Sequence, residues 1–160
     1  MDDMVDVPVE LGDRSYLVAV GHGARSRVAS MLPSGAKRVA IVTQEGIPSE
    51  YLPHLDGYAV THHIIGNGEA HKSLSTIEKL CSEFAQAGLT RADVVVGVGG
   101  GMVTDVAGFA AASYHRGIAV VHVATTLLAM IDAAIGGKTG VNIAEGKNLV
   151  GAFWQPHGVA

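Results

Sequence analysis

Hydrophobic and polar positions follow two alternating patterns along the chain, which together predict strands that take turns with helices. Solid apolar runs, typical of strands buried on both faces, occur at 37–43, 93–98 and 119–123, and a further strand is expected at 58–65. Apolar residues spaced three or four apart predict an amphipathic helix over 73–87, which Gly88 would end. Further helices are expected at 23–31, 103–114 and 127–135.

The two ends of the chain depart from this alternation. Two β-rich runs at 5–11 and 15–20 flank Gly12-Asp13-Arg14, a spacing that predicts a hairpin at an edge of the sheet. The segment 136–154 is interrupted by glycines and is predicted to be mostly loop. Together the patterns predict the α/β class, with a doubly wound, mostly parallel, Rossmann-like sheet and an N-terminal β-hairpin, in one domain over residues 1–160.

The composition excludes several classes of protein. With 160 residues, of which 48% are hydrophobic and 16% charged, the chain is expected to fold around a core rather than stay disordered. Its net charge of −4 and the lack of a basic cluster argue against a nucleic-acid partner. The most apolar stretch, 117–137, is interrupted by polar residues, so no membrane span is expected. A single cysteine and an acidic start at 1–6 without a signal-peptide pattern predict a cytoplasmic location.

Three consecutive glycines, Gly99, Gly100 and Gly101, follow the predicted strand at 93–98. Such a turn lets the backbone approach a ligand and directs helix N-terminal amides at a phosphate, so a pyrophosphate would fit there. A purely structural tight turn is the alternative, because neither the Rossmann fingerprint nor the Walker pattern is complete. Asp105, in the first turns of the next helix, either complements the helix dipole or hydrogen-bonds ligand hydroxyls.

More polar side chains follow the last predicted strand. Thr125 and Thr126 could bind a phosphate or ribose, or one of them could cap the helix expected at 127. Asp132 stands among apolar residues and would need a cationic or hydroxyl partner if it were buried. Lys138 and Lys147 lie in glycine-rich backbone and could bind one anion, although exposed lysines are more often simply solvated.

Two further groups of polar residues carry a weaker signal. Glu69 and Lys72 precede the helix at 73–87, where Glu69 could be a simple first-turn acid. The eight histidines show no ligand spacing, and His62 and His63 would point to opposite faces of a strand. No metal site is therefore predicted from these residues.

Ordered motifs across the second half of the chain resemble the 3-dehydroquinate synthase family, within the sugar phosphate cyclase superfamily. They are NGEAHKS at 67–73, GGGMVTDVAGF at 99–109, TTLLA at 125–129, Asp132 with GGKTGVN at 136–142, and GKNLVGAF at 146–153. The combination is much more specific than one glycine turn. The variants at Thr104 and at Ala133-Ala134 resemble actinobacterial members.

The resemblance implies an NAD-dependent carbon–oxygen lyase that converts 3-deoxy-D-arabino-heptulosonate 7-phosphate to 3-dehydroquinate and phosphate. This is the second step of the shikimate pathway to aromatic amino acids. It implies substrate-site and catalytic residues at Asp132, Lys138, Lys147 and Asn148. The cofactor contacts it implies are Asn67, Glu69, Lys72, Gly99, Gly100, Gly101, Thr104, Asp105, Thr125, Thr126, Lys138 and Lys147.

The resemblance covers the N-terminal portion of the family. Its members continue into a helical C-terminal domain that holds a divalent metal, zinc or cobalt, so the 160-residue chain is expected to be the NAD-binding domain alone. We expect this portion to be inactive in isolation and the full-length enzyme to be a homodimer acting on a sugar acid phosphate. The alternatives are a valiolone-type sugar phosphate cyclase and a nucleotide-binding module without catalysis. Gly137 and the run at 146–153 favour dehydroquinate synthase.

Overall fold

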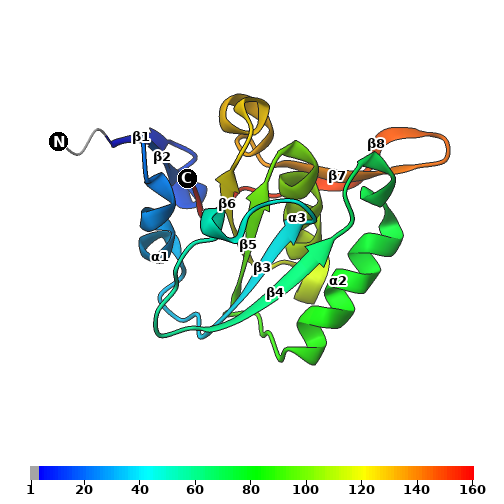
Figure 1. Ribbon diagram of the computed structural model, residues 1–160, viewed down its shortest axis with the longest axis horizontal. Helices are drawn as coiled ribbons and strands as arrows, with labels where there is room; N and C mark the ends of the chain where they lie inside the picture. Colours follow the sequence, from blue (N-terminus) through cyan, green and yellow to red (C-terminus); the bar gives the residue numbers. More distant parts are fainter. Residues whose placement is uncertain (1–3) are drawn as a thin grey trace.

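The computed structural model describes residues 4–160 and contains a seven-stranded sheet with helices on both faces (Figure 1). The strand order is β1-β2-β9-β6-β5-β3-β4, and only β1 runs antiparallel to its neighbour. The α/β class, the mostly parallel sheet and the N-terminal hairpin are therefore confirmed. The first three residues of the acidic start lie outside the described residues.

The strands and helices fall close to their predicted ranges. The strands of the main sheet are β1 (Val5–Val9), β2 (Tyr16–Val20), β3 (Arg38–Gln44), β4 (Ala59–Ile65), β5 (Val94–Gly99), β6 (Ala119–Ala124) and β9 (Gly158–Val159). The α-helices are α1 (Val28–Met31), α2 (Leu74–Gln86) and α3 (Gly101–Ser113). No described helix is long and apolar enough to span a bilayer.

The central strands are apolar throughout because both of their faces are covered. In β3, Ala40 and Val42 pack beneath α2 and α3, whereas Val39 and Ile41 pack on the side of α1. Successive side chains of a strand point to opposite faces, so a solid apolar run supplies two core layers at once. The helix α2 contributes Phe84, which is fully buried, to the first layer.

The order of the strands reverses between β3 and β5. The chain passes from β3 outward to β4 and then returns to β5 on the other side of β3. In doubly wound sheets, ligands bind outside the carboxyl ends of the strands where the winding reverses in this way. Gln44 ends β3 and Gly99 ends β5, so both stand at this edge.

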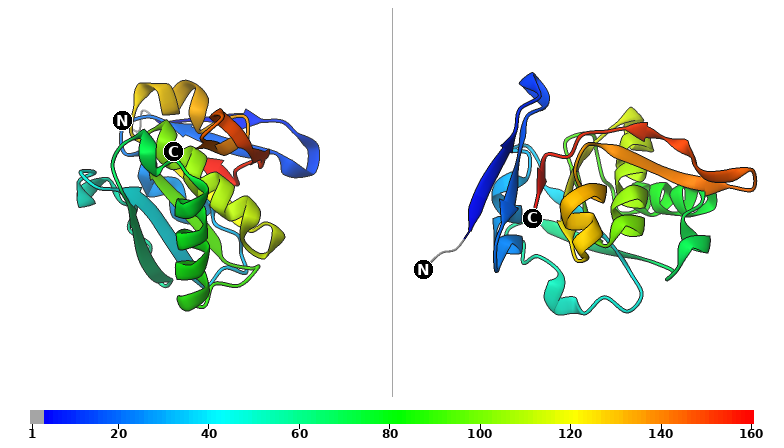
Figure 2. Two further views of the ribbon diagram at one scale, coloured as in Figure 1. Left: turned by 90° about the vertical axis from the view of Figure 1, so that its right-hand side faces the viewer. Right: turned by 90° about the horizontal axis from the view of Figure 1, so that it is seen from above.

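The segment predicted to be mostly loop, 136–154, instead forms a hairpin of β7 (Lys138–Ile143) and β8 (Gly146–Phe153). Its glycines permit strand pairing rather than interrupt it: Gly140 lies opposite Gly151, and a Cβ on Gly140 would lie 2.8 Å from the Val150 carbonyl oxygen. Figure 2 shows this hairpin, in orange, at the end of the molecule opposite the N-terminal hairpin.

Two predicted helices take other helical forms. The segment 23–31 contains a 3₁₀ turn, Ala24–Arg27, followed by the single turn of α1. Within 127–135, residues Ala129–Ala133 form a π-helix. Such widened turns are rare and often occur at functional sites.

Candidate functional site

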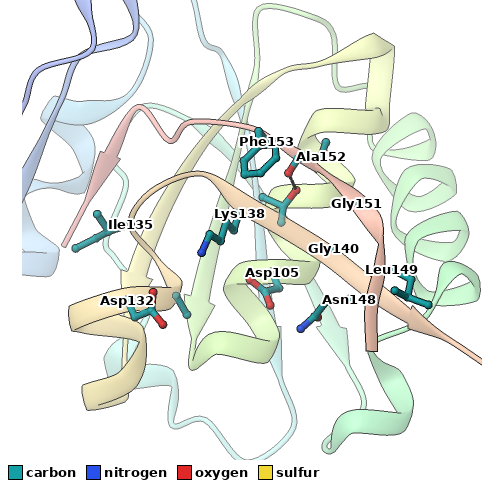
Figure 3. Close-up of a pocket in the computed structure, with 12 residues that line it drawn as sticks. Asp105, Asp132, Ile135, Lys138, Gly140, Asn148, Leu149, Gly151, Ala152 and Phe153 are labelled. Atoms are coloured by element: carbon teal, nitrogen blue, oxygen red, sulfur yellow. Dashed lines mark hydrogen bonds between the residues drawn. The ribbon is translucent and has the colours of Figure 1, made fainter. Parts of the chain in front are cut away.

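A pocket of about 470 Å³ opens between the start of α3, the π-helix and the β7–β8 hairpin. Figure 3 shows polar side chains from these three elements around it. They are Asp105, Asp132, Lys138 and Asn148. The fold thus brings together four predicted site residues that are well separated in the sequence.

Lys72 connects two of these pocket residues. Its ammonium donates a hydrogen bond to Asp105 Oδ2 at 2.7 Å and another to Asn148 Oδ1 at 2.5 Å. The Lys72 side chain is only 6% exposed, so its charge depends on these partners rather than on water. Asp105 therefore has a cationic partner in addition to its place near the start of a helix.

Burial and three nearby charged side chains determine the pKa of Asp105. Burial raises the pKa of this carboxyl group, and the hydrogen bond and charge of Lys72 act in the opposite direction. The negative charges of Glu69 and Asp132 raise the pKa further. A ligand that donates hydrogen bonds to these carboxylates would stabilise their charged forms.

The triple-glycine turn occupies the junction between β5 and α3, as predicted. Gly100 is the N-cap of α3 and Gly101 begins the helix. A Cβ on Gly100 would lie 3.0 Å from the Thr126 methyl carbon, and one on Gly101 would lie 3.1 Å from Ala133 Cβ. The turn is thus packed closely against the next loop and helix, while its amides stand at a helix N-terminus suited to a phosphate.

The two threonines after β6 have separate roles. Thr126 Oγ1 accepts a hydrogen bond from the Ala129 amide at 3.3 Å, so it caps the helix that follows. The Thr125 amide donates to the Gly99 carbonyl at 2.9 Å and joins the ends of β6 and β5. Thr125 also borders a second, mostly apolar pocket of about 930 Å³.

Of the twelve predicted cofactor residues, only Asp105 and Lys138 line the first pocket. Three of the other ten make structural hydrogen bonds. Asn67 follows β4, and its Oδ1 accepts a hydrogen bond from Gln44 at 3.1 Å. Glu69 Oε1 accepts one from Asn142 Nδ2 at 2.9 Å. Thr104 is buried in α3, where its hydroxyl donates to the carbonyl three residues earlier at 3.2 Å, so it faces its own helix.

Asp132 and the two predicted substrate lysines differ in position. Asp132 is exposed on the π-helix, so it needs no cationic or hydroxyl partner within the protein. The buried contacts of this turn are made by Ala129 and Ala134. Lys138 begins β7 and lines the pocket. Lys147 is exposed near the turn of the hairpin and is not among the lining residues.

Three more side chains near this pocket belong to the motifs at 136–142 and 146–153, although none of them was predicted as a site residue. Leu149 and Phe153 line it and are 60% and 79% exposed. The sequence 149–153 is apolar or glycine at every position, so no alternation of polar and apolar residues marked this strand. The third side chain, Asn142, stands at an irregularity in the β7–β8 register.

Metal-ligating side chains do not cluster in the part of the chain that the structure describes: no three His, Cys, Asp or Glu residues there could hold one ion. His62 and His63 lie on opposite faces of β4, as predicted, with His62 exposed and His63 buried. The Nδ1 atom of His63 lies 2.8 Å from Glu83 Oε2, so this histidine connects β4 to α2.

Proteins with similar sequences include 3-dehydroquinate synthases. The chain is 51% identical over 156 residues to a protein of Amycolatopsis mediterranei (strain S699) provisionally named an aminodehydroquinate synthase, covering 96% of this chain and 43% of that protein. It is 45% identical over 164 residues to the 3-dehydroquinate synthase of Nitrobacter hamburgensis, covering 96% and 42% respectively. The chain therefore spans less than half the length of these relatives.

Solved structures agree with this similarity. A 2-deoxy-scyllo-inosose synthase complexed with carbaglucose-6-phosphate, NAD⁺ and Co²⁺ has a TM-score of 0.89 and 32% identity, covering 97% of this chain and 44% of that one. The 2-epi-5-epi-valiolone synthase of Streptomyces hygroscopicus subsp. jinggangensis, solved with NAD⁺ and Zn²⁺, has a TM-score of 0.78 and 31% identity over the same shares. The family described as 3-dehydroquinate synthase N-terminal matches residues 62–160. Since this match covers more than half of its length, the chain belongs to the 3-dehydroquinate synthase family.

Proposed function

We propose that this chain is the NAD-binding N-terminal domain of a 3-dehydroquinate synthase, comprising residues 1–160. The observation that carries the proposal is the buried Lys72 ammonium, which holds Asp105 and Asn148 at a pocket that Lys138 and Asp132 also line. Such a pocket offers a cation, Lys138, and hydrogen-bond acceptors to one ligand. A phosphorylated sugar acid carries negative charge and several hydroxyls, and so matches this combination.

The cofactor would lie along the glycine turn. The amides of this turn stand at the N-terminus of α3, where they would bind a pyrophosphate. The two pockets that Asp105 and Thr125 border would then receive the two halves of a dinucleotide. When bound, NAD would supply the reversible oxidation of a substrate hydroxyl.

The residues of the chain would bind and orient the substrate. Lys138 would attract an oxyanion as a point charge, and the Asn148 amide would donate to a neighbouring oxygen. Asp105 and Asp132 would accept hydrogen bonds from hydroxyls of cofactor or substrate. A role for Lys147 rests on the family resemblance, since its side chain lies near the hairpin turn.

A phosphate-release assay on the full-length protein tests this function. With NAD and a divalent metal, 3-deoxy-D-arabino-heptulosonate 7-phosphate should yield 3-dehydroquinate and phosphate, whereas glucose 6-phosphate should not. The 160-residue chain serves as a further arm and should release no phosphate, because the relatives are more than twice as long. Turnover of glucose 6-phosphate alone would reassign the protein to another cyclase of the superfamily.

A second candidate is an aminodehydroquinate synthase, favoured by the 51% identity to the Amycolatopsis mediterranei protein. This activity would act on an amino analogue of the same seven-carbon substrate. The comparison of kcat/KM for the hydroxyl and amino forms decides between the two. A preference for the amino form would support the second candidate and reject the first.

A homodimer in the cytoplasm completes the proposal. The single cysteine suits a reducing compartment, and dimers are common in the family. Sedimentation of the full-length protein should give twice the monomer mass. A monomer at micromolar concentration would contradict the dimer.

A further inference from the structure

One residue, Asn142, contacts two separate segments beside the pocket: the stretch 69–72 before α2, and the strand β8 at Asn148. It lies next to the end of β7, where the register of β7 and β8 shifts between Val141 and Ile143. Its backbone amide donates to the Lys72 carbonyl at 2.9 Å. Its Nδ2 donates to Glu69 Oε1 at 2.9 Å, and its Oδ1 accepts from the Asn148 amide at 2.9 Å.

The hydrogen bond to Asn148 acts on a residue with an unusual backbone. Asn148 has φ of +56°, a left-handed conformation that non-glycine residues adopt infrequently and that needs support from its surroundings. The Asn142 carboxamide supplies that support by holding the Asn148 amide. Without it, the backbone that carries the Asn148 side chain would lose this anchor.

The orientation of the Asn148 side chain then follows from Lys72. An ammonium can only donate, so Lys72 fixes Asn148 Oδ1 toward itself at 2.5 Å. The Nδ2 group of Asn148 is thereby turned toward the pocket, where Figure 3 shows its nitrogen. The Asn148 Nδ2 group is therefore a neutral hydrogen-bond donor at a defined place in the pocket.

We propose that Asn142 is a positioning residue that joins the Glu69 loop to the β7–β8 hairpin and so fixes Asn148 and Lys72 for ligand binding. The effects that we predict on kcat/KM rest on the proposed function. Asn142 does not line the pocket and acts through the residues that do. Its backbone amide, its Nδ2 and its Oδ1 each make one of these hydrogen bonds, so changes to one group have separable effects.

Reversing the donor and acceptor in the hydrogen bond between Asn142 and Glu69 tests the proposal in the full-length enzyme. Asn142→Asp keeps the acceptor for Asn148 but places a carboxylate against Glu69, so kcat/KM for the sugar phosphate should fall about tenfold or more through like-charge repulsion. Glu69→Gln alone keeps an acceptor for Asn142 and reports the cost of losing the Glu69 charge. When both substitutions are combined, the amide introduced by Glu69→Gln can donate to the carboxylate introduced by Asn142→Asp. Activity of this double variant should therefore return to within about threefold of Glu69→Gln.

The matched control is Glu145→Gln, a charge change in the exposed turn of the same hairpin. It should leave kcat and KM unchanged. If Asn142 had a structural role alone, Asn142→Asp would lower the melting temperature, and adding Glu69→Gln would not restore activity. Equal impairment of Asn142→Asp and the double variant, or wild-type activity of Asn142→Asp, would overturn the proposal.

A readout without turnover separates this inference from the proposed function. In Asn142→Ala the Asn148 amide loses its acceptor and should exchange its hydrogen faster, whereas in Asn142→Asp its protection should persist. If the wild-type protein releases no phosphate, the proposed function fails, and the exchange experiment still decides the positioning role. Unchanged protection of the Asn148 amide in Asn142→Ala would reject it.

Discussion

Lys72 Nζ lies 2.7 Å from Asp105 Oδ2, although the two residues are 33 positions apart. The exposed fractions of the two side chains are 6% and 21%, so the pair is mostly removed from water. Removing one partner from such a pair leaves a buried charge without compensation, which costs more than the net contribution of the intact pair. The ion pair therefore fixes the loop before α2 to the first turns of α3.

We expect Lys72→Met to lower the free energy of unfolding by about 3 kcal/mol, near the lower limit for breaking a buried pair. Asp105→Asn should cost less, because a neutral amide can still accept a hydrogen bond from Lys72. The double variant should be more stable than the sum of the single changes predicts, by about 1 kcal/mol or more. Thermal unfolding of the four proteins measures this coupling, and strictly additive effects would show that the two charges are independent.

The close packing at Gly100 gives a second prediction. Gly100→Val should weaken NAD binding about tenfold or more, because the new side chain would press on Thr126, 3.0 Å from the Cβ position, and shift the backbone amides that would bind the phosphate. Calorimetric titration of the full-length protein with NAD provides the measurement. Gly35→Val is the control, since a Cβ there meets nothing within 4 Å. Wild-type affinity in a folded Gly100→Val protein would remove the glycine turn from the cofactor site.

The central strands could be predicted from sequence because their physics is local. A strand covered on both faces is apolar at every position, and β3, β5 and β6 carry that pattern. A strand just after Pro156 was expected from the family resemblance, but the place of the two-residue strand β9 between β2 and β6 could not be predicted, because two residues carry no period. The β7–β8 hairpin was missed because Gly140 and Gly151 were interpreted as interruptions.

The same limit applies to the site. Gly99 to Asp105 follow one another along a strand and a helix, so their common position could be predicted. The contact between Lys72 and Asn148 joins residues 76 positions apart and depends on the hairpin that the sequence pattern did not show. The exposure of Asp132 depends on the π-helix, whose widened turn has no recognised sequence pattern.

His122 predicts how stability changes with pH. Its side chain is buried on β6, and burial lowers its pKa to about 4 from the ordinary value of 6.5. Between these two values the unfolded chain binds a proton that the folded chain does not, so stability falls as pH decreases from 6.5 toward 4. The full loss is on the order of 3 kcal/mol.

His122→Leu removes this titration and should flatten the stability profile between pH 6.5 and 4. Gly97 provides room on the neighbouring strand, since a Cβ there would lie 3.1 Å from His122 Nδ1. His62→Leu, on the exposed face of β4, is the matched control and should keep the wild-type slope. Chemical denaturation at several pH values tests this, and equal slopes for both variants would exclude His122 as the source.

Lys138 provides the most direct test of the pocket. It begins β7 and lines the pocket together with Asp105 and Asn148. If its ammonium binds an oxyanion of the sugar phosphate, Lys138→Met removes a hydrogen bond to a charged group and should raise KM about tenfold to a hundredfold. The affinity for NAD should change less, because lysine acts here as a point charge on the substrate. Lys37→Met makes the same chemical change just before β3, at the amino end of the sheet, and should leave both constants unaltered. Steady-state kinetics with separate titration of NAD distinguishes the outcomes, since an equal loss for NAD and sugar phosphate would assign Lys138 to the cofactor instead.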